Sequence, residues 1–229
     1  MTNVEFQNTE KLYHYTSFES ALKILGTKSL RFSKLSGLND INESYRPIID
    51  SLSAEISLTF CGQISFTHDG KREGFAIPSL WGHYAQKGYG VCFVFDKSKI
   101  ISQIQDAFEF ADNIRYNDEY DNTINPKEES VQTFFAKNRD KLFFTKKADW
   151  CNEQEFRILG EAREYMSYED SLMAIIMCFA DDVEKGKSIF NSANAKILRK
   201  CSPYQVPILQ FGYSFGNPQL KGENNIKWN

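Results

Sequence analysis

The chain has 229 residues, of which 41% are hydrophobic and 25% charged, and it carries a net charge of −3. This length and composition predict one globular domain over residues 1–229. Its motifs lie between about residues 11 and 180. Residues 181–229 are expected to form a C-terminal extension that packs on the same core. The acidic balance argues against a protein that binds nucleic acid regardless of sequence, because such proteins normally carry a basic surface. An enzyme that acts on nucleic acid through a local patch is still compatible with it.

Cysteine usage and the first residues bear on the compartment. The five cysteines lie far apart and none forms a C-x-x-C pair, which disfavours a cysteine zinc site. The odd count, and a polar and acidic start unlike a signal peptide, predict reduced thiols in the cytoplasm. The longest apolar run, residues 172–180, is too short to span a bilayer, so no membrane partner is expected.

Short strands alternate with helices in the first half of the chain. Residues 11–16, K-L-Y-H-Y-T, predict a strand, after which Ser17 caps a helix that ends near Gly26. The further predicted elements are a strand at 29–35, a turn at 37–43, a helix at about 43–58, a strand at 63–67, a helix from Pro78 and a buried strand at 91–96.

The second half is predicted to continue in the same mixed manner. Its elements are a helix at 97–107, a strand at 113–116, a helix at 130–144, a strand after Glu155, a buried strand at 172–179, a helix after Asp181 and Asp182, and short strands in the tail. The order lacks a regular βαβ rhythm, so the predicted fold class is α+β: a mixed, mostly antiparallel sheet with peripheral helices.

Basic residues gather at the end of the helix predicted at 130–144. They are Lys137, Arg139, Lys141, Lys146 and Lys147. We interpret them as solvated charges near a helix C-terminus. The alternative is a small patch that faces phosphate.

The strongest local signal is W-C-N-E-Q-E-F-R-I at residues 150–158. Positions two apart on a strand share a face, so Glu153, Glu155 and Arg157 are predicted to project together. Two neighbouring carboxylates cost free energy unless water, a cation or a substrate hydroxyl compensates them, which indicates a site. The alternative is an edge strand that shows its charges to water.

Histidines are few, and two of the three lie beside tyrosines. His14 lies in Y-H-Y-T and His83 in W-G-H-Y, whereas His68 opens a polar loop. The histidines lack the i, i+4 spacing of helical metal ligands, so no metal is expected. Trp81 is predicted to pack in the core. For His83, a pocket role and core packing stay equally open.

Several motifs occur together in a recognisable order. They are Y-H-Y-T, L-R-F-S, L-N-D, I-S-F-T, L-W-G-H-Y-A, G-V-C-F-V-F-D and W-C-N-E-Q-E-F-R, between residues 11 and 180. In this order the chain resembles a bacterial domain family of unknown function, whose members are small cytosolic proteins, some linked to phage defence. That family is distantly similar to the ADP-ribosyltransferase fold, which implies a split sheet that binds NAD.

The ADP-ribosyltransferase resemblance implies a role for individual residues. Carried onto this chain, it makes Glu155 the catalytic glutamate with Glu153 as its partner, and it makes His14 the first-strand residue that holds the NAD ribose. The remaining implied NAD contacts are Thr16, the pair Ser65 and Thr67, and a nicotinamide-stacking ring from Tyr15 or Tyr84, with Arg31, His83 and Arg157 in support. The S-F-T strand departs from the usual S-T-S, and the L-W-G-H-Y helix has no firm equivalent.

These residues suit NAD chemistry. Breaking the nicotinamide–ribose bond builds positive charge, which a carboxylate beside the ribose stabilises in the transition state. The first hypothesis is therefore an NAD-consuming transferase or glycohydrolase that acts as a toxin or phage-defence effector. Its acceptor is unknown and could be a protein, a nucleic acid or a small molecule. An antitoxin or a phage protein would be a further partner. The alternative is a non-catalytic nucleotide- or protein-binding sensor, and the third is a metal-dependent nuclease.

Overall fold

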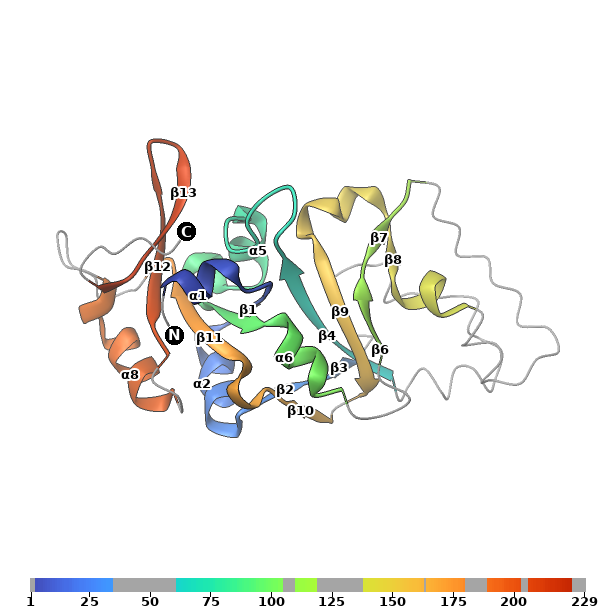
Figure 1. The fold of residues 1–229 in the computed structure, drawn as a ribbon, viewed down its shortest axis with the longest axis horizontal. Coiled ribbons are helices and arrows are strands. Elements are labelled where there is room, and N and C mark those ends of the chain that lie inside the picture. Colours follow the sequence, from blue (N-terminus) through green and yellow to red (C-terminus); the bar gives the residue numbers. More distant parts are fainter. Residues whose placement is uncertain are drawn as a thin grey trace. The chain divides into compact units, whose positions relative to one another are not determined.

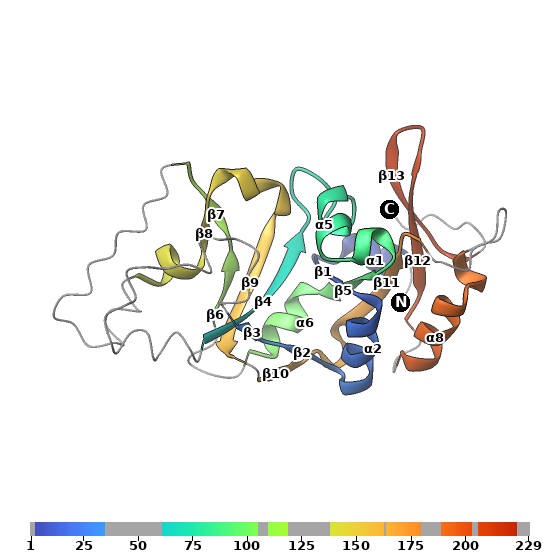
Figure 2. The same ribbon diagram turned by 180° about the vertical axis from the view of Figure 1, so that it is seen from behind.

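Helices combine with a mixed, mostly antiparallel open sheet in the computed structural model, so the predicted α+β class is confirmed (Figures 1 and 2). The structure describes residues 3–34, 61–104, 110–118, 138–162, 164–179, 189–202 and 206–223. It divides into two compact units. The first unit comprises Met1–Leu30, Phe66–Gln103 and Ser167–Asn229, and the second comprises Arg31–Ser65 and Ile104–Met166. One domain over the whole chain stays a prediction.

The sheet of the first unit has the strand order β13-β12-β11-β5-β1, followed by the last residues of β4. The strands are β1 (Lys11–Thr16), β4 (Cys61–His68), β5 (Val91–Asp96), β11 (Leu172–Met177), β12 (Ile208–Ser214) and β13 (Asn217–Lys221). β11 and β12 run parallel, and the other pairs are antiparallel. β5 and β11 are buried almost throughout, as their near-continuous apolar sequences predict.

Three helices of the first unit begin at the polar caps Ser17, Asp96 and Ser192, whereas the helix that begins at Pro78 has no side-chain cap. The Ser17 hydroxyl accepts a hydrogen bond from the backbone N–H of Ser20, which confirms the predicted cap of α2. This helix runs on past Gly26 to Thr27, and Lys28 ends it in a left-handed conformation. The helices are α1 (Asn3–Asn8), α2 (Phe18–Thr27), α5 (Pro78–His83), α6 (Lys97–Ser102) and α8 (Ala193–Cys201), with the short 3-10 turns η3 (Gln86–Gly88), η5 (Glu169–Ser171) and η6 (Ile189–Asn191).

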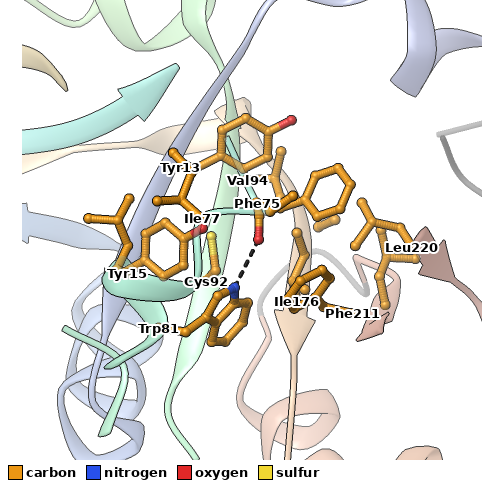
Figure 3. Close-up of a cluster of buried hydrophobic side chains, with 14 of the residues drawn as sticks. Tyr13, Tyr15, Phe75, Ile77, Trp81, Cys92, Val94, Ile176, Phe211 and Leu220 are labelled. Carbon is orange, nitrogen blue, oxygen red and sulfur yellow. Dashed lines mark hydrogen bonds between the residues drawn. The ribbon is translucent and has the colours of Figure 1, made fainter. Parts of the chain in front are cut away.

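An aromatic core lies between the sheet and the segment that leads into α5 (Figure 3). Trp81 presents its ring to the edge of Tyr15 at 5.1 Å and stacks on Phe211 at 5.6 Å. Its Nε1 donates to the carbonyl oxygen of Phe75 at 2.8 Å, and Tyr15 Oη donates to that of Gly74 at 2.6 Å. Trp81 is therefore a core residue, as predicted. The Tyr15 bond fixes the loop before α5 to the sheet, and the Trp81 bond fixes the same loop to α5.

The second unit is built around β9 (Glu155–Glu161). This strand lies next to β4 and pairs antiparallel with β6 (Phe110–Asn113). The unit also holds β3 (Ser33–Lys34), which pairs with β4, the parallel pair β7 (Arg115–Tyr116) and β8 (Thr145–Lys146), the 3-10 helix η4 (Ala148–Glu153), and a helical segment at 138–143. Because β9 has a neighbour on each side and is buried from Glu155 to Leu159, the alternative of a solvated edge strand is wrong.

Some predicted boundaries differ from those observed. The strand predicted at 29–35 is divided into β2 (Ser29–Arg31) and β3 at Phe32, whose ring is buried and occupies the space above Gly160. β10 covers Tyr165–Ser167. The helix predicted at 97–107 ends at Ser102. The predictions at 37–43, 43–58 and after Asp181 lie outside the described residues, as does most of the helix at 130–144.

Candidate functional site

The two glutamates singled out by the sequence lie together in the second unit. Strand alternation puts Glu155 and Arg157 on one face of β9, and the guanidinium binds the carboxylate through two 3.0 Å hydrogen bonds. Glu153 reaches the same place from the last turn of η4, because Gln154 adopts a left-handed conformation (φ 47°) between them. Lys146 Nζ on β8 joins the two carboxylates, at 2.7 Å from Glu155 Oε2 and 2.9 Å from Glu153 Oε2.

Water has almost no access to this ion cluster, which we define as Lys146, Glu153, Glu155 and Arg157. Their exposed fractions are 5%, 8%, 4% and 0%, respectively. Arg157 Nη1 donates to the carbonyl oxygen of Phe143 at 2.6 Å. Burial by itself would raise the pKa of Glu155, but the charges of Arg157 and Lys146 and their hydrogen bonds outweigh it and lower the pKa to about 2.

The ion cluster compensates its own charges. Glu155 and Arg157 share a face of the strand as predicted, whereas Glu153 joins them from a 3-10 helix and not from the strand, and the protein supplies the compensating cations. A substrate would have to displace an arginine or a lysine before it reached the carboxylate of Glu155. The interpretation of Lys146 as a solvated charge is wrong, since it is buried against two acids. Only the fold of η4 brings Lys146 back to them.

His14 and its neighbours on β1 divide between the two faces of the sheet. Tyr13 and Tyr15 point into the aromatic core, and alternation places His14 and Thr16 on the opposite face. The ring of His14 there lies 5.7 Å from that of Phe66. The predicted set on β1 therefore does not line one pocket.

The pair predicted on β4 is likewise separated from His14. Thr67 is the register partner of Tyr13, so it lies on the core face of the sheet, opposite to His14. Ser65 belongs to the second unit, where its hydroxyl accepts a hydrogen bond from Gln63 Nε2 at 3.0 Å. The NAD contacts implied for His14 and Thr67 would have to come from two different faces.

The remaining predicted residues have varied surroundings. Tyr15 is buried and makes a T-shaped contact with Trp81, and because it is buried its ring has no face open to solvent for stacking. Tyr84 is half-buried against the aromatic core, while His83 and Arg31 are exposed. Catalytic and NAD-binding roles for all these residues stay predictions.

A pocket that the sequence did not indicate opens on the first unit, where α2 and α8 begin. It is open to solvent and has a volume of about 620 Å³. Its lining residues come from three distant segments and are Phe18, Glu19, Leu22, Gln86, Tyr89 and Asn194. We call it the α2–α8 pocket. It combines aromatic and aliphatic surface with two side-chain amides, which are groups that small-molecule sites use for contact and orientation.

The wall of this pocket contains an unusual backbone. Gln86, Lys87 and Gly88 follow one another with positive φ angles of 48°, 56° and 93°. For a residue with a side chain this conformation costs about 1–2 kcal/mol. Hydrogen bonds from the N–H groups of Gly88 and Gly90 to the carbonyl of Ala85, at 2.9 and 2.8 Å, hold it in place. Strain of this kind gathers at ligand-binding segments.

The strained turn presents Tyr89 outward. Its side chain is 43% exposed, and its ring lies 5.7 Å from that of Phe179, which is 53% exposed. Phe179 in turn donates its N–H to the carbonyl of Gly88 at 3.0 Å. A side chain at position 88 would lie 2.6 Å from the Phe179 ring, so the turn requires glycine there. Two aromatic rings are thereby held at the surface beside the pocket.

The described residues contain neither a group of metal-ligating side chains nor a helix suited to cross a membrane. Within them, no three His, Cys, Asp or Glu side chains are placed to hold a metal ion. Nor does any helix among them have the length and apolar character needed to cross a membrane.

One stretch of the chain matches a known family. Residues 80–158 match the family described as Protein of unknown function (DUF2971). The resemblance to a domain family of unknown function is thus confirmed over this stretch, which includes Gln86, Tyr89 and the whole ion cluster. No curated protein and no solved structure matches the chain. The similarity to ADP-ribosyltransferases stays a prediction.

Proposed function

We propose that the chain is a nucleotide-binding sensor module, which takes the base of a nucleoside or nucleotide into the α2–α8 pocket. The observation that carries this proposal is Tyr89, an exposed ring held by a strained turn on the wall of a pocket that also offers the amides of Gln86 and Asn194. An aromatic ring stacks on a base, and amides bond to the polar edges of the base. The open mouth leaves room in solvent for ribose and phosphate.

The charge at the pocket agrees with a neutral ring as the buried part of the ligand. Glu19 is the one acidic or basic residue among the described residues that line the pocket, and it is exposed. Its carboxylate is 2.8 Å from Lys23 Nζ, one helical turn further along α2. Because the two charges offset each other, the pocket itself adds little attraction for a phosphate.

The ion pairs of Glu155 weigh against the transferase hypothesis. A carboxylate that stabilises a reacting ribose must face it, whereas both oxygens of Glu155 are bound by Arg157 and Lys146. NAD turnover by the wild-type chain would bring that hypothesis back, so NAD belongs among the ligands tested.

Isothermal titration with guanosine, inosine, adenosine, their monophosphates and NAD tests the proposal. Stacking on an aromatic ring contributes about 1–3 kcal/mol, so Tyr89→Ala is expected to weaken binding by about 5- to 140-fold. Tyr165→Ala is the matched control, because Tyr165 is 59% exposed and lies in the other unit. If no nucleoside or nucleotide binds, or if Tyr89→Ala binds as tightly as the control, the pocket is not a nucleotide site.

A further inference from the structure

We infer that Gln86 determines base specificity in the α2–α8 pocket, and that it selects a ring bearing a carbonyl oxygen over the same ring bearing an amino group. Inosine and adenosine are such a pair: they differ in the oxygen or amino group at position 6 and in the proton that inosine carries at N1, and they share N7 beside position 6. The inference rests on the proposed function, since it concerns the edge of the base that stacks on Tyr89.

One hydrogen bond fixes the orientation of the Gln86 amide. The backbone N–H of Phe18 points to Gln86 Oε1 at 2.9 Å. Phe18 is the first residue of α2, and N–H groups in a first helical turn have no partner within the helix. A backbone N–H can only donate, so the amide atom that faces it must be the oxygen. The usual ambiguity between the two ends of a glutamine side chain is therefore removed.

The amide nitrogen is the end that remains for a ligand. Within the part of the chain that the structure describes, Nε2 of Gln86 has no recorded hydrogen-bond partner. Nε2 has two hydrogens and no lone pair to offer, so it can only donate. The strained backbone at Gln86 is held by the bond from the N–H of Tyr89 to its carbonyl, at 3.1 Å. Gln86 is thus fixed at both its backbone and its side-chain oxygen.

A fixed donor distinguishes the two nucleosides. A glutamine that is free to turn reads adenine with both ends, accepting from the amino group and donating to N7. In this pocket Oε1 already accepts from Phe18 and keeps one lone pair, so the amino group of adenosine can bond it from one direction only, whereas Nε2 keeps both of its hydrogens for a ligand. Inosine presents two acceptors, O6 and N7, to the free Nε2. The amide of Asn194, on the first turn of α8, has no recorded partner among the described residues and can adopt either orientation.

Two substitutions separate recognition from structure. Gln86→Glu keeps an oxygen for the Phe18 N–H and replaces the donor by a second acceptor. Gln86→Met has a similar length but loses both. If Gln86 served only to cap α2, Gln86→Met would lower the melting temperature, Gln86→Glu would not, and neither would change the ratio of the two affinities. Neutral nucleosides are the probes, because the added charge of Gln86→Glu would affect phosphates.

Titration of wild type, Gln86→Glu and Gln86→Met with inosine and adenosine decides the matter. We expect wild type to bind inosine about tenfold more tightly than adenosine, and Gln86→Glu to lose or reverse that preference. Equal affinities in wild type, or an unchanged ratio in Gln86→Glu, would overturn the specificity and leave nucleoside binding intact. If neither nucleoside binds to wild type, the proposed function falls, and the role of Gln86 falls with it.

Discussion

Replacement of Arg157 by methionine tests whether the ion cluster is a structural unit. The cluster contains two cations and two carboxylates, so its formal charge is zero. Arg157→Met leaves a buried net charge of −1 and removes the donor to the carbonyl of Phe143. Breaking a buried ion pair in this way typically costs about 3–5 kcal/mol. That is a large share of the about 5–15 kcal/mol by which a domain is stable.

Two further variants are the controls with which the stability of Arg157→Met is compared. Arg115→Met removes an arginine from the same unit that pairs with Asp140 at 2.8 Å but is 60% exposed, so a cost of about 0–1 kcal/mol is expected. The double variant Arg157→Met/Glu155→Leu removes one charge of each sign and leaves Lys146 paired with Glu153. It is expected to be more stable than Arg157→Met alone, because no unpaired charge stays buried.

Urea unfolding followed by circular dichroism and by intrinsic fluorescence measures these differences. Two probes are needed because the chain has two compact units, and a single free energy of unfolding is meaningful only if both probes report the same transition. The reasoning is refuted if Arg157→Met costs no more than Arg115→Met. It is also refuted if the double variant is as unstable as Arg157→Met.

Three further predictions concern pH, the β12–β13 turn and the thiols. The pKa of Glu155 is lowered from 4.5 to about 2, so its contribution to stability is complete above pH 4.5 and is lost as the pH falls toward 2. The urea midpoint of the wild type should therefore drop over that range. The midpoint of the double variant, which lacks Glu155, should drop much less. Phe215 is fully exposed and has a left-handed backbone conformation (φ 51°) before Gly216. Because asparagine tolerates this conformation better, Phe215→Asn should stabilise the hairpin by about 1 kcal/mol. An unchanged or lower melting temperature in calorimetry would contradict this. Burial raises the pKa of Cys178 to about 11, whereas Cys201 is exposed. Iodoacetamide at pH 8 should therefore alkylate Cys201 before Cys178, as measured by peptide mass spectrometry. Equal alkylation rates at the two cysteines would argue against the packing around Cys178.

Some strands and helices could be predicted because the residues that specify them lie within the element or directly beside it. The apolar runs at 91–96 and 172–179 predicted the two buried strands, the second of which ends at Met177, because a strand covered on both faces needs hydrophobic side chains at nearly every position. Ser17 predicted the start of α2 because a serine hydroxyl can satisfy the first free N–H groups of a helix. Alternation on a strand likewise predicted that Glu155 and Arg157 share a face.

Partners distant in sequence were decided by the tertiary structure alone. Nothing local says that Lys146 returns to Glu155, or that Gln86 receives the N–H of Phe18. The same alternation that joins Glu155 to Arg157 separates His14 from Tyr15, and only the pairing of β1 with β4 shows that Thr67 lies on the other face from His14. The sequence by itself therefore determined which segments become strands and helices and which residues can carry charge. Whether a charge meets solvent or another charge depended on which segments the fold brings together, because a polar group buried without a partner costs more than most single contacts contribute.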